Sequence, residues 1–361
     1  MKTDILVVGA GPAGSVTARF AAEKGARVTL IERRPEIGVP VRCGELMPSC
    51  EEIKGFYPSV PDLDSLLYVP KDLRVREMEG IRLIDPKDRC TEVEFTGYTT
   101  DRDRYDQYLA GEAVKAGADL IKGCAFKNIR NGIAETSEGD IEYKVIIGAD
   151  GPSSRVARSL GLPKNMNPYP AVTAQAKGDF EPYVTMYFGG IAPGAYSWII
   201  PKAGCANVGV GFSPKFADGT LDGYFEKFKN IHDFEITSEK LNGKYVPSEG
   251  PIARTVAGNG MVVGDAAGHV ISVSGGGLPQ AVIGGRICGQ VAADHIKEGR
   301  ALSDYETEWR RAMLKPLKTA AFNKKLADMF AFRSERSTTI CMSILGKRRL
   351  TKLIKCKRLF P

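Results

Sequence analysis

Near its N-terminus the chain carries residues suited to binding the pyrophosphate and a ribose of an adenine dinucleotide. Residues 9–14 are Gly-Ala-Gly-Pro-Ala-Gly, a G-x-G-x-x-G pattern. Gly9 allows a tight turn, Gly11 lets the backbone approach a pyrophosphate, and Gly14 lets a helix lie close on a strand. Glu32 follows 18 residues after Gly14, near the spacing at which a carboxylate accepts hydrogen bonds from ribose hydroxyls. This fingerprint predicts an adenine dinucleotide without deciding which one.

The flanking segments predict the strand–helix–strand unit that positions this fingerprint. Residues 4–8 and 27–31 are short and mainly apolar, as in buried parallel strands. Residues 15–24 have the small and apolar side chains of a closely packed helix, and Gly25 ends it. The N-terminus of that helix directs unpaired N–H groups and the positive end of its dipole towards the phosphates.

Two later segments indicate which dinucleotide is bound. Residues 144–151 form an apolar run ending in Ala149-Asp150-Gly151, and residues 260–267 form another that contains Gly264-Asp265. A glycine triplet then opens a predicted helix at Leu278. These ordered motifs resemble the flavoprotein class that binds FAD in the manner of the aromatic hydroxylases. The resemblance spans residues 1 to about 300 and implies FAD as the cofactor.

The resemblance also assigns roles to particular residues. Asp265 would bind the ribityl chain, and the amides of residues 276–278 would face the flavin pyrimidine, where a helix N-terminus stabilises negative charge. Arg102 would lie near the FAD phosphates, and Ala125 would touch adenine through its backbone. The complete set of predicted FAD contacts is Gly9, Gly11, Ala13, Gly14, Glu32, Arg33, Arg42, Cys43, Gly44, Arg102, Ala125, Asp150, Gly264, Asp265, Gly276, Gly277 and Leu278.

Two further patterns narrow the family. Residues 39–45 are V-P-V-R-C-G-E, and residues 196–202 are Y-S-W-I-I-P-K, followed by N-V-G-V-G at residues 207–211. Together they resemble the geranylgeranyl reductase family, whose archaeal members saturate isoprenoid double bonds of membrane lipids. Ile200 departs from the Phe usual before the proline, and Ser272 stands where the family has Pro. The resemblance implies an FAD-dependent oxidoreductase acting on CH–CH groups of isoprenoid lipids.

Four residues are candidates for contact with the substrate or the reacting part of the flavin. Cys43 lies in the loop after the second strand, beside the cation of Arg42, and the resemblance implies that it lines the flavin. Tyr196 and Trp198 point to one face of a strand, where they either pack in the core or form the wall of a prenyl tunnel. We predict Cys43 and Tyr196 as catalytic, and Tyr196, Trp198 and Glu45 as substrate-binding. His269 is interpreted as a structural hydrogen-bond partner.

Saturating an isolated alkene requires both a hydride and a proton. Reduced FAD supplies the hydride, whereas Cys43, Glu45, Tyr196 and ordered water are all candidate proton donors. Only one dinucleotide fingerprint is present, so we expect no dedicated NAD(P)H domain. Electrons would therefore come from a transiently bound nicotinamide, a deazaflavin or an external carrier such as ferredoxin.

The C-terminal part of the chain is strongly basic. Residues 310–361 contain 15 Lys or Arg residues and two acidic residues, and apolar residues recur at a helical spacing from Ile340 to Ile354. Such a helix either lies on an anionic membrane or binds an acidic partner, or it packs its apolar stripe on its own protein. Nucleic acid is not supported by any recognised motif. We expect a peripheral association with the inner face of the membrane.

Composition sets the remaining limits. The chain has 361 residues, 43% hydrophobic and 26% charged, which is ordinary for a globular protein. We find no apolar run of membrane-spanning length and no signal peptide, so we expect a cytoplasmic protein. Eight Cys without a C-x-x-C pair and three His predict no metal site and a reducing compartment.

The predicted architecture is an α/β protein with a Rossmann-like FAD-binding domain, a β-sheet substrate domain and a C-terminal helical segment. The predicted ranges are 1–75, 100–165 and 255–300 for the FAD-binding domain, 76–99 and 166–254 for the substrate domain, and 301–361 for the basic helical segment. An FAD-dependent monooxygenase acting on an aromatic or quinone substrate shares the FAD motifs and is the alternative function. A non-catalytic FAD protein is a second alternative.

Overall fold

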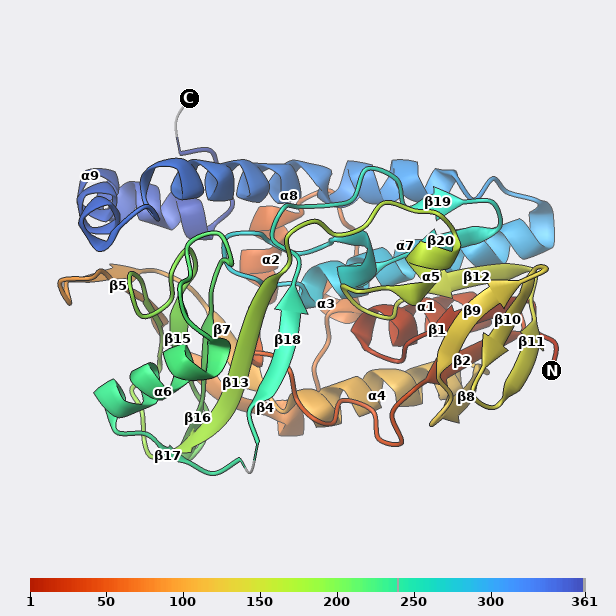
Figure 1. Ribbon diagram of the computed structural model, residues 1–361. Coiled ribbons are helices and arrows are strands. Elements are labelled where there is room, and N and C mark those ends of the chain that lie inside the picture. Colours follow the sequence, from red (N-terminus) through yellow and green to blue (C-terminus); the bar gives the residue numbers. More distant parts are fainter. Residues whose placement is uncertain (239, 360–361) are drawn as a thin grey trace.

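The computed structural model describes residues 1–238 and 240–359. Residue 239, in the predicted substrate domain, and residues 360 and 361, at the end of the predicted helical segment, lie outside that part. Two sheet-based regions stand side by side, and the C-terminal helices lie along one side of the molecule, at the top of the view (Figure 1). The fold class expected from the sequence, a mixed α/β protein with a Rossmann-like region, is confirmed.

The nucleotide-binding region is built on a six-stranded sheet in the order β19-β20-β12-β1-β2-β8. Every neighbouring pair is parallel except β19 and β20. The strands are β1 (Ile5–Val8), β2 (Val28–Glu32), β8 (Asp119–Lys122), β12 (Val145–Gly148), β19 (Val256–Ala257) and β20 (Gly260–Val262). All four residues of β1 and of β12 are buried, as in parallel strands that are covered on both faces.

The two faces of this sheet bury different layers. Ile5 and Val7 belong to the core under the helices, whereas Leu6 and Val8 pack towards a small second sheet, because successive side chains of a strand alternate between faces. The helical layer contains α1 (Pro12–Glu23), α4 (Arg102–Lys115) and α7 (Leu278–Glu298). The other layer contains β9 (Phe126–Arg130), β10 (Ile133–Thr136), β11 (Gly139–Glu142) and α5 (Arg155–Ser159).

Helix α1 begins at Pro12, three residues before the start predicted from the sequence. Gly11 is its N-cap, and Pro12 occupies the first turn. A proline at this position loses no helical hydrogen bond, and its fixed φ angle already suits a helix. The proline therefore starts the helix inside the glycine-rich loop and brings its first amide groups next to Gly11.

The second region is built on an eight-stranded sheet in the order β17-β13-β16-β15-β14-β5-β6, with β18 also paired to β13. Its pairs are antiparallel except for β14 with β5. The strands are β5 (Gly80–Ile84), β6 (Cys90–Val93), β13 (Tyr169–Lys177), β14 (Tyr183–Tyr187), β15 (Ser197–Pro201), β16 (Cys205–Gly211), β17 (Glu235–Ile236) and β18 (Asn242–Val246).

One face of the eight-stranded sheet is covered by α6 (Leu221–His232). Phe225 and Phe228 of this helix pack against alternate residues of β13 and β16, including Val172 and Val208. The strand residues that alternate with these valines point to the opposite face of the sheet. Tyr196, Trp198 and Asn207 are on that opposite face, so the predicted substrate residues lie on the side away from α6.

Smaller elements join the two regions. A three-stranded sheet has the order β3-β7-β4, formed by β3 (Leu46–Pro48), β4 (Arg74–Met78) and β7 (Gly97–Thr100). Three short helices lie in the chain between β3 and β4: α2 (Cys50–Phe56), α3 (Leu63–Leu66) and η1 (Lys71–Leu73). A fourth, η2 (Gly264–Ala267), follows β20.

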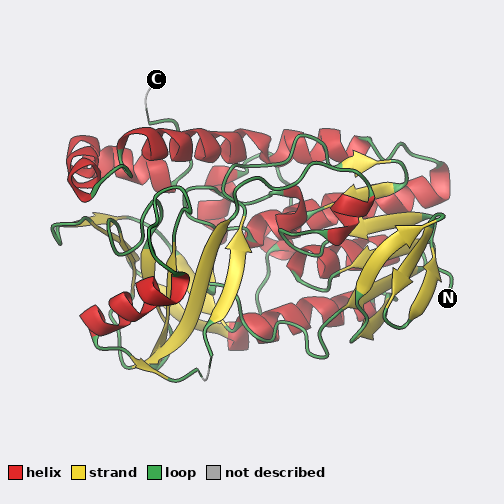
Figure 2. Ribbon diagram, in the orientation of Figure 1, coloured by secondary structure: helices red, strands yellow, loops and turns green. Residues whose placement is uncertain are grey.

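The C-terminal segment forms α8 (Asp304–Phe330) and α9 (Glu335–Ile354). Helix α8 has 27 residues, about 40 Å of helix, and it extends along the nucleotide-binding region towards α9 (Figure 2). Leu350 of α9 is buried against the eight-stranded sheet, with Leu345, Leu353 and Ile354 beside it. Ile340 and Ile344 remain exposed. Packing on its own protein thus holds for part of the apolar surface of this helix, and the rest of that surface is exposed. No helix in the described part of the chain has both the length and the apolar character needed to cross a membrane.

Helices α1 and α7 approach so closely that side chains larger than hydrogen are excluded at their contact. A Cβ atom at Gly289 of α7 would lie 2.4 Å from the carbonyl oxygen of Thr17, and one at Gly285 would lie 2.7 Å from that of Ala13. Both obstacles are backbone atoms of α1. This contact fixes α1, and with it the fingerprint loop, against α7.

We expect Gly289→Ala to destabilise the protein by about 1–3 kcal/mol, the usual cost of overpacking. Gly111→Ala in α4 is the matched control, because nothing lies within 4 Å of a Cβ atom there. Replacing a helical Gly with Ala at an open position stabilises by roughly 0.4–1 kcal/mol. Thermal and urea unfolding of both variants would measure the difference, and equal effects would contradict the proposed helix contact.

Candidate functional site

The motifs found in the sequence meet at the carboxyl edge of the six-stranded sheet. A Cβ atom at Gly9, just after β1, would lie 2.5 Å from the carbonyl oxygen of Ala149, just after β12. A Cβ atom at Gly264, after β20, would lie 2.8 Å from the Cβ atom of Ala13. Loops at the carboxyl ends of parallel strands form the ligand-binding crevice in this kind of sheet.

The fingerprint loop has the shape that a dinucleotide pyrophosphate needs. A Cβ atom at Gly14 would lie 1.8 Å from the carbonyl oxygen of Gly9, so the fold itself requires glycine there. Gly11 instead faces open space, with nothing within 4 Å of a Cβ atom. The Glu32 carboxylate returns to the loop and accepts from the Ala10 amide at 3.0 Å. The residues therefore fit the phosphates and ribose of FAD.

The last motif provides a second polar surface at this edge. An Asp265 oxygen lies 3.3 Å from where a Cβ atom of Gly277 would be, and Gly277 is the N-cap of α7. Gly275 and Gly276 are exposed, whereas Leu278 is buried. The first amide groups of a 21-residue helix thus lie beside Asp265, an arrangement that suits an electron-rich ring.

The Cys43 loop lies between β2 and β3 and contacts the start of α4. Cys43 Sγ accepts from Arg102 Nη1 at 2.9 Å and from the Glu45 amide at 3.3 Å. Arg102 also pairs with Asp106, with an Nη2–Oδ1 distance of 2.9 Å. Burial opposes the charge of Arg102, but Asp106, Cys43 and Glu45 outweigh it and raise the pKa of the guanidinium. Arg102 therefore stays charged and directed at Cys43.

Glu45 joins the Cys43 loop to the eight-stranded sheet. Its side chain is 1% exposed and its φ angle is 64°. The carboxylate accepts from Lys202 Nζ at 3.0 Å, Asn207 Nδ2 at 3.0 Å and Gln175 Nε2 at 2.7 Å. Lys202 also pairs with Asp101 at 2.8 Å. Burial lowers the pKa of Lys202, but these two carboxylates produce a net increase. Protein groups thus occupy the hydrogen-bonding positions of the Glu45 carboxylate.

Asn207 fixes both Trp198 and the Cys43 loop. Its Oδ1 accepts from Trp198 Nε1 at 2.9 Å, and its Nδ2 donates to the Cys43 carbonyl at 2.8 Å. The indole lies across Gly209, where a Cβ atom would be 2.1 Å from Trp198 Cζ2. On its other side, Trp198 Nε1 is 3.9 Å from where a Cβ atom of Gly44 would be. The indole ring is therefore held next to the Cys43 loop.

Tyr196 extends the aromatic surface. Its ring is 6.0 Å from that of Trp198 at 63°, and its hydroxyl donates to the carbonyl oxygen of Ser274 in the loop before the glycine triplet. Burial, and then the charge of Cys43, raise the pKa of the Tyr196 phenol. The phenol therefore keeps its proton at neutral pH. Tyr196 and Trp198 also border the apolar cluster that reaches Leu345 and Leu350 of α9.

Comparison with known proteins identifies the family. The profile of an NAD(P)-binding Rossmann-like domain matches residues 7–52, and that of the geranylgeranyl reductase catalytic domain matches residues 170–242. Digeranylgeranylglycerophospholipid reductase of Methanothrix thermoacetophila is 35% identical, over 88% of this chain and 85% of its own length. The chain belongs to the digeranylgeranylglycerophospholipid reductase family. The Methanocaldococcus jannaschii member is 34% identical, over 90% of this chain and 88% of its own length.

Solved structures agree with membership of the digeranylgeranylglycerophospholipid reductase family. A geranylgeranyl bacteriochlorophyll reductase-like protein from Thermoplasma acidophilum has a TM-score of 0.83 and 26% identity, covering 99% of this chain and 93% of that chain. The flavin-dependent brominase Bmp2 has a TM-score of 0.71 and 17% identity, covering 99% and 94%. The brominase likeness concerns the fold alone.

Some predicted site residues of this reductase family member contact protein groups instead. The Ala125 amide and carbonyl both bond to Ser137. The Asp150 carboxylate accepts from Ser154 Oγ at 2.5 Å and the Arg155 amide at 2.7 Å, and so organises the start of α5. Arg33 and Arg42 are exposed. The cofactor roles of these four residues remain predictions.

His269 differs from our expectation. It is completely buried and lies 4.5 Å from Trp309, ring centre to ring centre. Neither ring nitrogen has a hydrogen-bond partner among the described residues, so the interpretation of His269 as a hydrogen-bond partner is wrong for this structure. Burial lowers its pKa to about 3. The ring is therefore neutral and packs mainly as an aromatic group.

Sequence reasoning missed several polar residues of the site. Lys202 and Asn207 lie inside the second family pattern, and their polarity within an otherwise apolar segment is the signal that could have identified them. Gln175, and Lys244, whose Nζ lies 2.7 Å from Asp265 Oδ2, stand in no recognised motif. They enter the site because β13 and β18 pair in register beside β16, which only the folded sheet defines.

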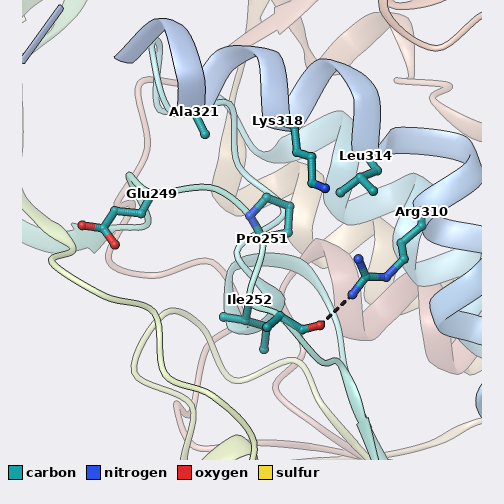
Figure 3. Close-up of a pocket in the computed structure, with 8 residues that line it drawn as sticks. Glu249, Pro251, Ile252, Arg310, Leu314, Lys318 and Ala321 are labelled. Atoms are coloured by element: carbon teal, nitrogen blue, oxygen red, sulfur yellow. Dashed lines mark hydrogen bonds between the residues drawn. The ribbon is translucent and has the colours of Figure 1, made fainter. Parts of the chain in front are cut away.

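A surface cavity of about 390 Å³ lies elsewhere, between α8 and the loop before β19 (Figure 3). Arg310 and Lys318 line its helical side, and Pro251 and Ile252 line the loop side. Arg310 donates to the carbonyl oxygen of Ala253 at 2.7 Å, so this cation already has a partner. None of the motif residues lines this cavity, and the site is therefore assigned to the sheet edge.

We expect Lys202→Met to destabilise the protein by about 3–5 kcal/mol, because Glu45 would keep a buried charge without its cation. Adding Glu45→Gln to that variant removes the charge and should restore part of the loss. Lys177→Met is the control, since its partner Glu235 is exposed and such pairs contribute little. Urea unfolding measures all three. An equally small loss of stability in Lys202→Met and Lys177→Met would contradict the proposal that Glu45 holds the Cys43 loop to the eight-stranded sheet.

Proposed function

We propose that this protein is an FAD-dependent reductase that saturates carbon–carbon double bonds of geranylgeranyl chains on membrane lipid precursors. One observation carries the proposal: the aromatic face formed by Tyr196 and Trp198 is tied through Asn207 to the Cys43 loop, and through Tyr196 to the loop before α7. An apolar chain lying on that face would be next to the flavin. Family membership supports the same substrate class.

The chain's own residues position the substrate and control protons. Bound FAD, when reduced, supplies the hydride. Trp198 is fixed by Asn207, and Tyr196 by Ser274, so both rings present a rigid apolar wall that excludes water and orients an alkene. Cys43 Sγ is held as an acceptor by Arg102, whereas Tyr196 Oη holds a proton. Glu45 is enclosed by its partners, so we favour Tyr196 and Cys43 over Glu45 as candidate proton donors.

An anaerobic single-turnover assay tests this function. The flavin of the purified holoprotein is photoreduced and mixed with a geranylgeranyl phospholipid. We expect flavin reoxidation together with a product heavier by two hydrogens for each bond reduced, and at least about tenfold slower reoxidation in Trp198→Ala, since misplacement of reacting groups costs rate steeply. A phospholipid with saturated chains is the control. Reoxidation only by oxygen, with hydroxylation of an aromatic substrate, would support the monooxygenase alternative instead.

We also propose an external electron donor. The chain has one dinucleotide fingerprint, and FAD would occupy it. A nicotinamide, a deazaflavin or a ferredoxin would then reduce the flavin from outside. The excess of cations in residues 310–361 also suits an acidic carrier. Anaerobic reduction of the bound flavin by each of these donors in turn distinguishes them.

Helix α9 supports contact with a membrane. Arg336, Ile340 and Ile344 are four residues apart, on one helix face. Ile340 is 47% and Ile344 is 68% exposed. In the same part of the helix, before its non-helical Gly346, Met342 and Leu345 pack against the cluster that contains Tyr196 and Trp198. We propose that this outer face lies on the anionic inner surface of the membrane, close to where a lipid chain would reach the site.

We expect Ile344→Asp to weaken binding to anionic phospholipid vesicles at least about tenfold, because burying one Ile contributes roughly 1.5–3 kcal/mol. Ile231→Asp on α6 is the matched control, since Ile231 is also exposed, at 59%, but lies on another helix. Vesicle sedimentation measures both variants, at low and high salt. Equal binding by the two variants and the unmodified protein would refute the α9 surface.

A further inference from the structure

Strand β18 carries a lysine onto the substrate face of the eight-stranded sheet. Lys244 pairs across the ladder with Ala171 of β13, and Thr173, two residues further on, donates to Asn207 at 2.7 Å. Paired residues and alternate residues of a sheet share a face. Lys244 therefore points to the same side as Trp198 and Asn207, rather than towards α6.

From that face Lys244 reaches across to the nucleotide-binding region. Its Nζ lies 2.7 Å from Asp265 Oδ2. The other Asp265 oxygen lies against Gly277, the N-cap of α7. The Lys244 side chain is 36% exposed and that of Asp265 is 18% exposed. A lysine, a carboxylate and a helix N-terminus thus meet at one point.

The charge on Lys244 is maintained by its surroundings. Burial disfavours the charged form of Lys244. The attraction of Asp265 outweighs this effect, so the pKa of Lys244 is raised. Cys43 acts in the same direction, and the cation of Arg102 acts against it. Lys244 is therefore a fixed positive charge at neutral pH, and the amide groups at the start of α7 add a partial positive charge beside it.

We propose that Lys244, together with the N-terminus of α7, stabilises the negative charge of reduced FAD at the pyrimidine end of the flavin. This inference rests on the proposed function, in which residues 276–278 face that end of the flavin and Asp265 binds the ribityl chain next to it. Two-electron reduction followed by loss of the N1 proton leaves one negative charge on the N1–C2–O2 part of the ring. A preorganised cation there favours that form over the neutral oxidised ring, and thereby sets how readily the external donor reduces the enzyme.

A purely structural ion pair predicts a different behaviour. If Lys244 served only to join the two regions through Asp265, its removal would destabilise the fold but would treat oxidised and reduced FAD alike. If it acts on the reduced cofactor, its removal weakens the binding of reduced FAD more than that of oxidised FAD. The two roles are therefore separated by the difference between two dissociation constants.

The test uses the FAD-loaded protein and the variants Lys244→Met and Lys244→Arg, with Lys177→Met as the control. Lys177 lies in the same sheet and pairs with a carboxylate, but it is 64% exposed. Spectrophotometric titration against a reference dye gives the midpoint potential. We expect the ratio of reduced to oxidised flavin at a fixed potential to fall at least tenfold in Lys244→Met, a decrease of about 30 mV for a two-electron couple. Lys244→Arg and Lys177→Met should stay near the unmodified protein.

Dissociation constants for oxidised and photoreduced FAD cover the case in which Lys244→Met loses cofactor. The proposal requires the constant for reduced FAD to rise at least tenfold more than that for oxidised FAD. An equal rise of both, or an unchanged midpoint potential, would overturn it. Failure of the unmodified protein to bind FAD would instead reject the proposed function itself, so the two failures are distinguishable.

Discussion

The buried carboxylate of Glu45 is the interaction on which the rest of the site depends. It accepts hydrogen bonds from Asn207 and Gln175 of the eight-stranded sheet and from Lys202, just after β15. Its own backbone belongs to the Cys43 loop. A buried charge is stable only when it is paired and fully hydrogen-bonded. Both regions must therefore keep their relative position to satisfy it, and this requirement brings Cys43 next to Trp198.

The two faces of the eight-stranded sheet have different roles: one forms an apolar core, and the other carries the residues of the candidate site. On one face, Val172 and Val208 pack under Phe225 and Phe228 of α6 and form an apolar core. On the other, alternate residues carry the aromatic wall, the Asn207 network and Lys244. Because side chains alternate along a strand, the same strands supply both surfaces without interference. The site face can thus hold polar and charged groups at little cost to the core.

Helix α9 has a comparable division. Leu345 and Leu350 continue the apolar cluster that begins at Trp198, whereas Ile340 and Ile344 stay on the surface. One helix therefore contributes to the wall of the proposed lipid site and to the proposed membrane contact. For a substrate that resides in a bilayer, the proposed membrane contact would shorten the path between the membrane and the flavin.

The sequence by itself determined the nucleotide-binding region, because each of its parts is local: glycines at Gly9 and Gly14, an apolar strand before them, a helix after them and Glu32 beyond. The family patterns likewise located Cys43, Tyr196 and Trp198. Only the tertiary structure decided what these side chains touch. Gln175 and Lys244 join the site through strand pairing. Glu45 connects the Cys43 loop to the eight-stranded sheet because its carboxylate is enclosed by partners from that side. His269 is buried, and its ring nitrogens have no hydrogen-bond partner among the described residues. Such contacts depend on register and burial between distant segments, which no local spacing records.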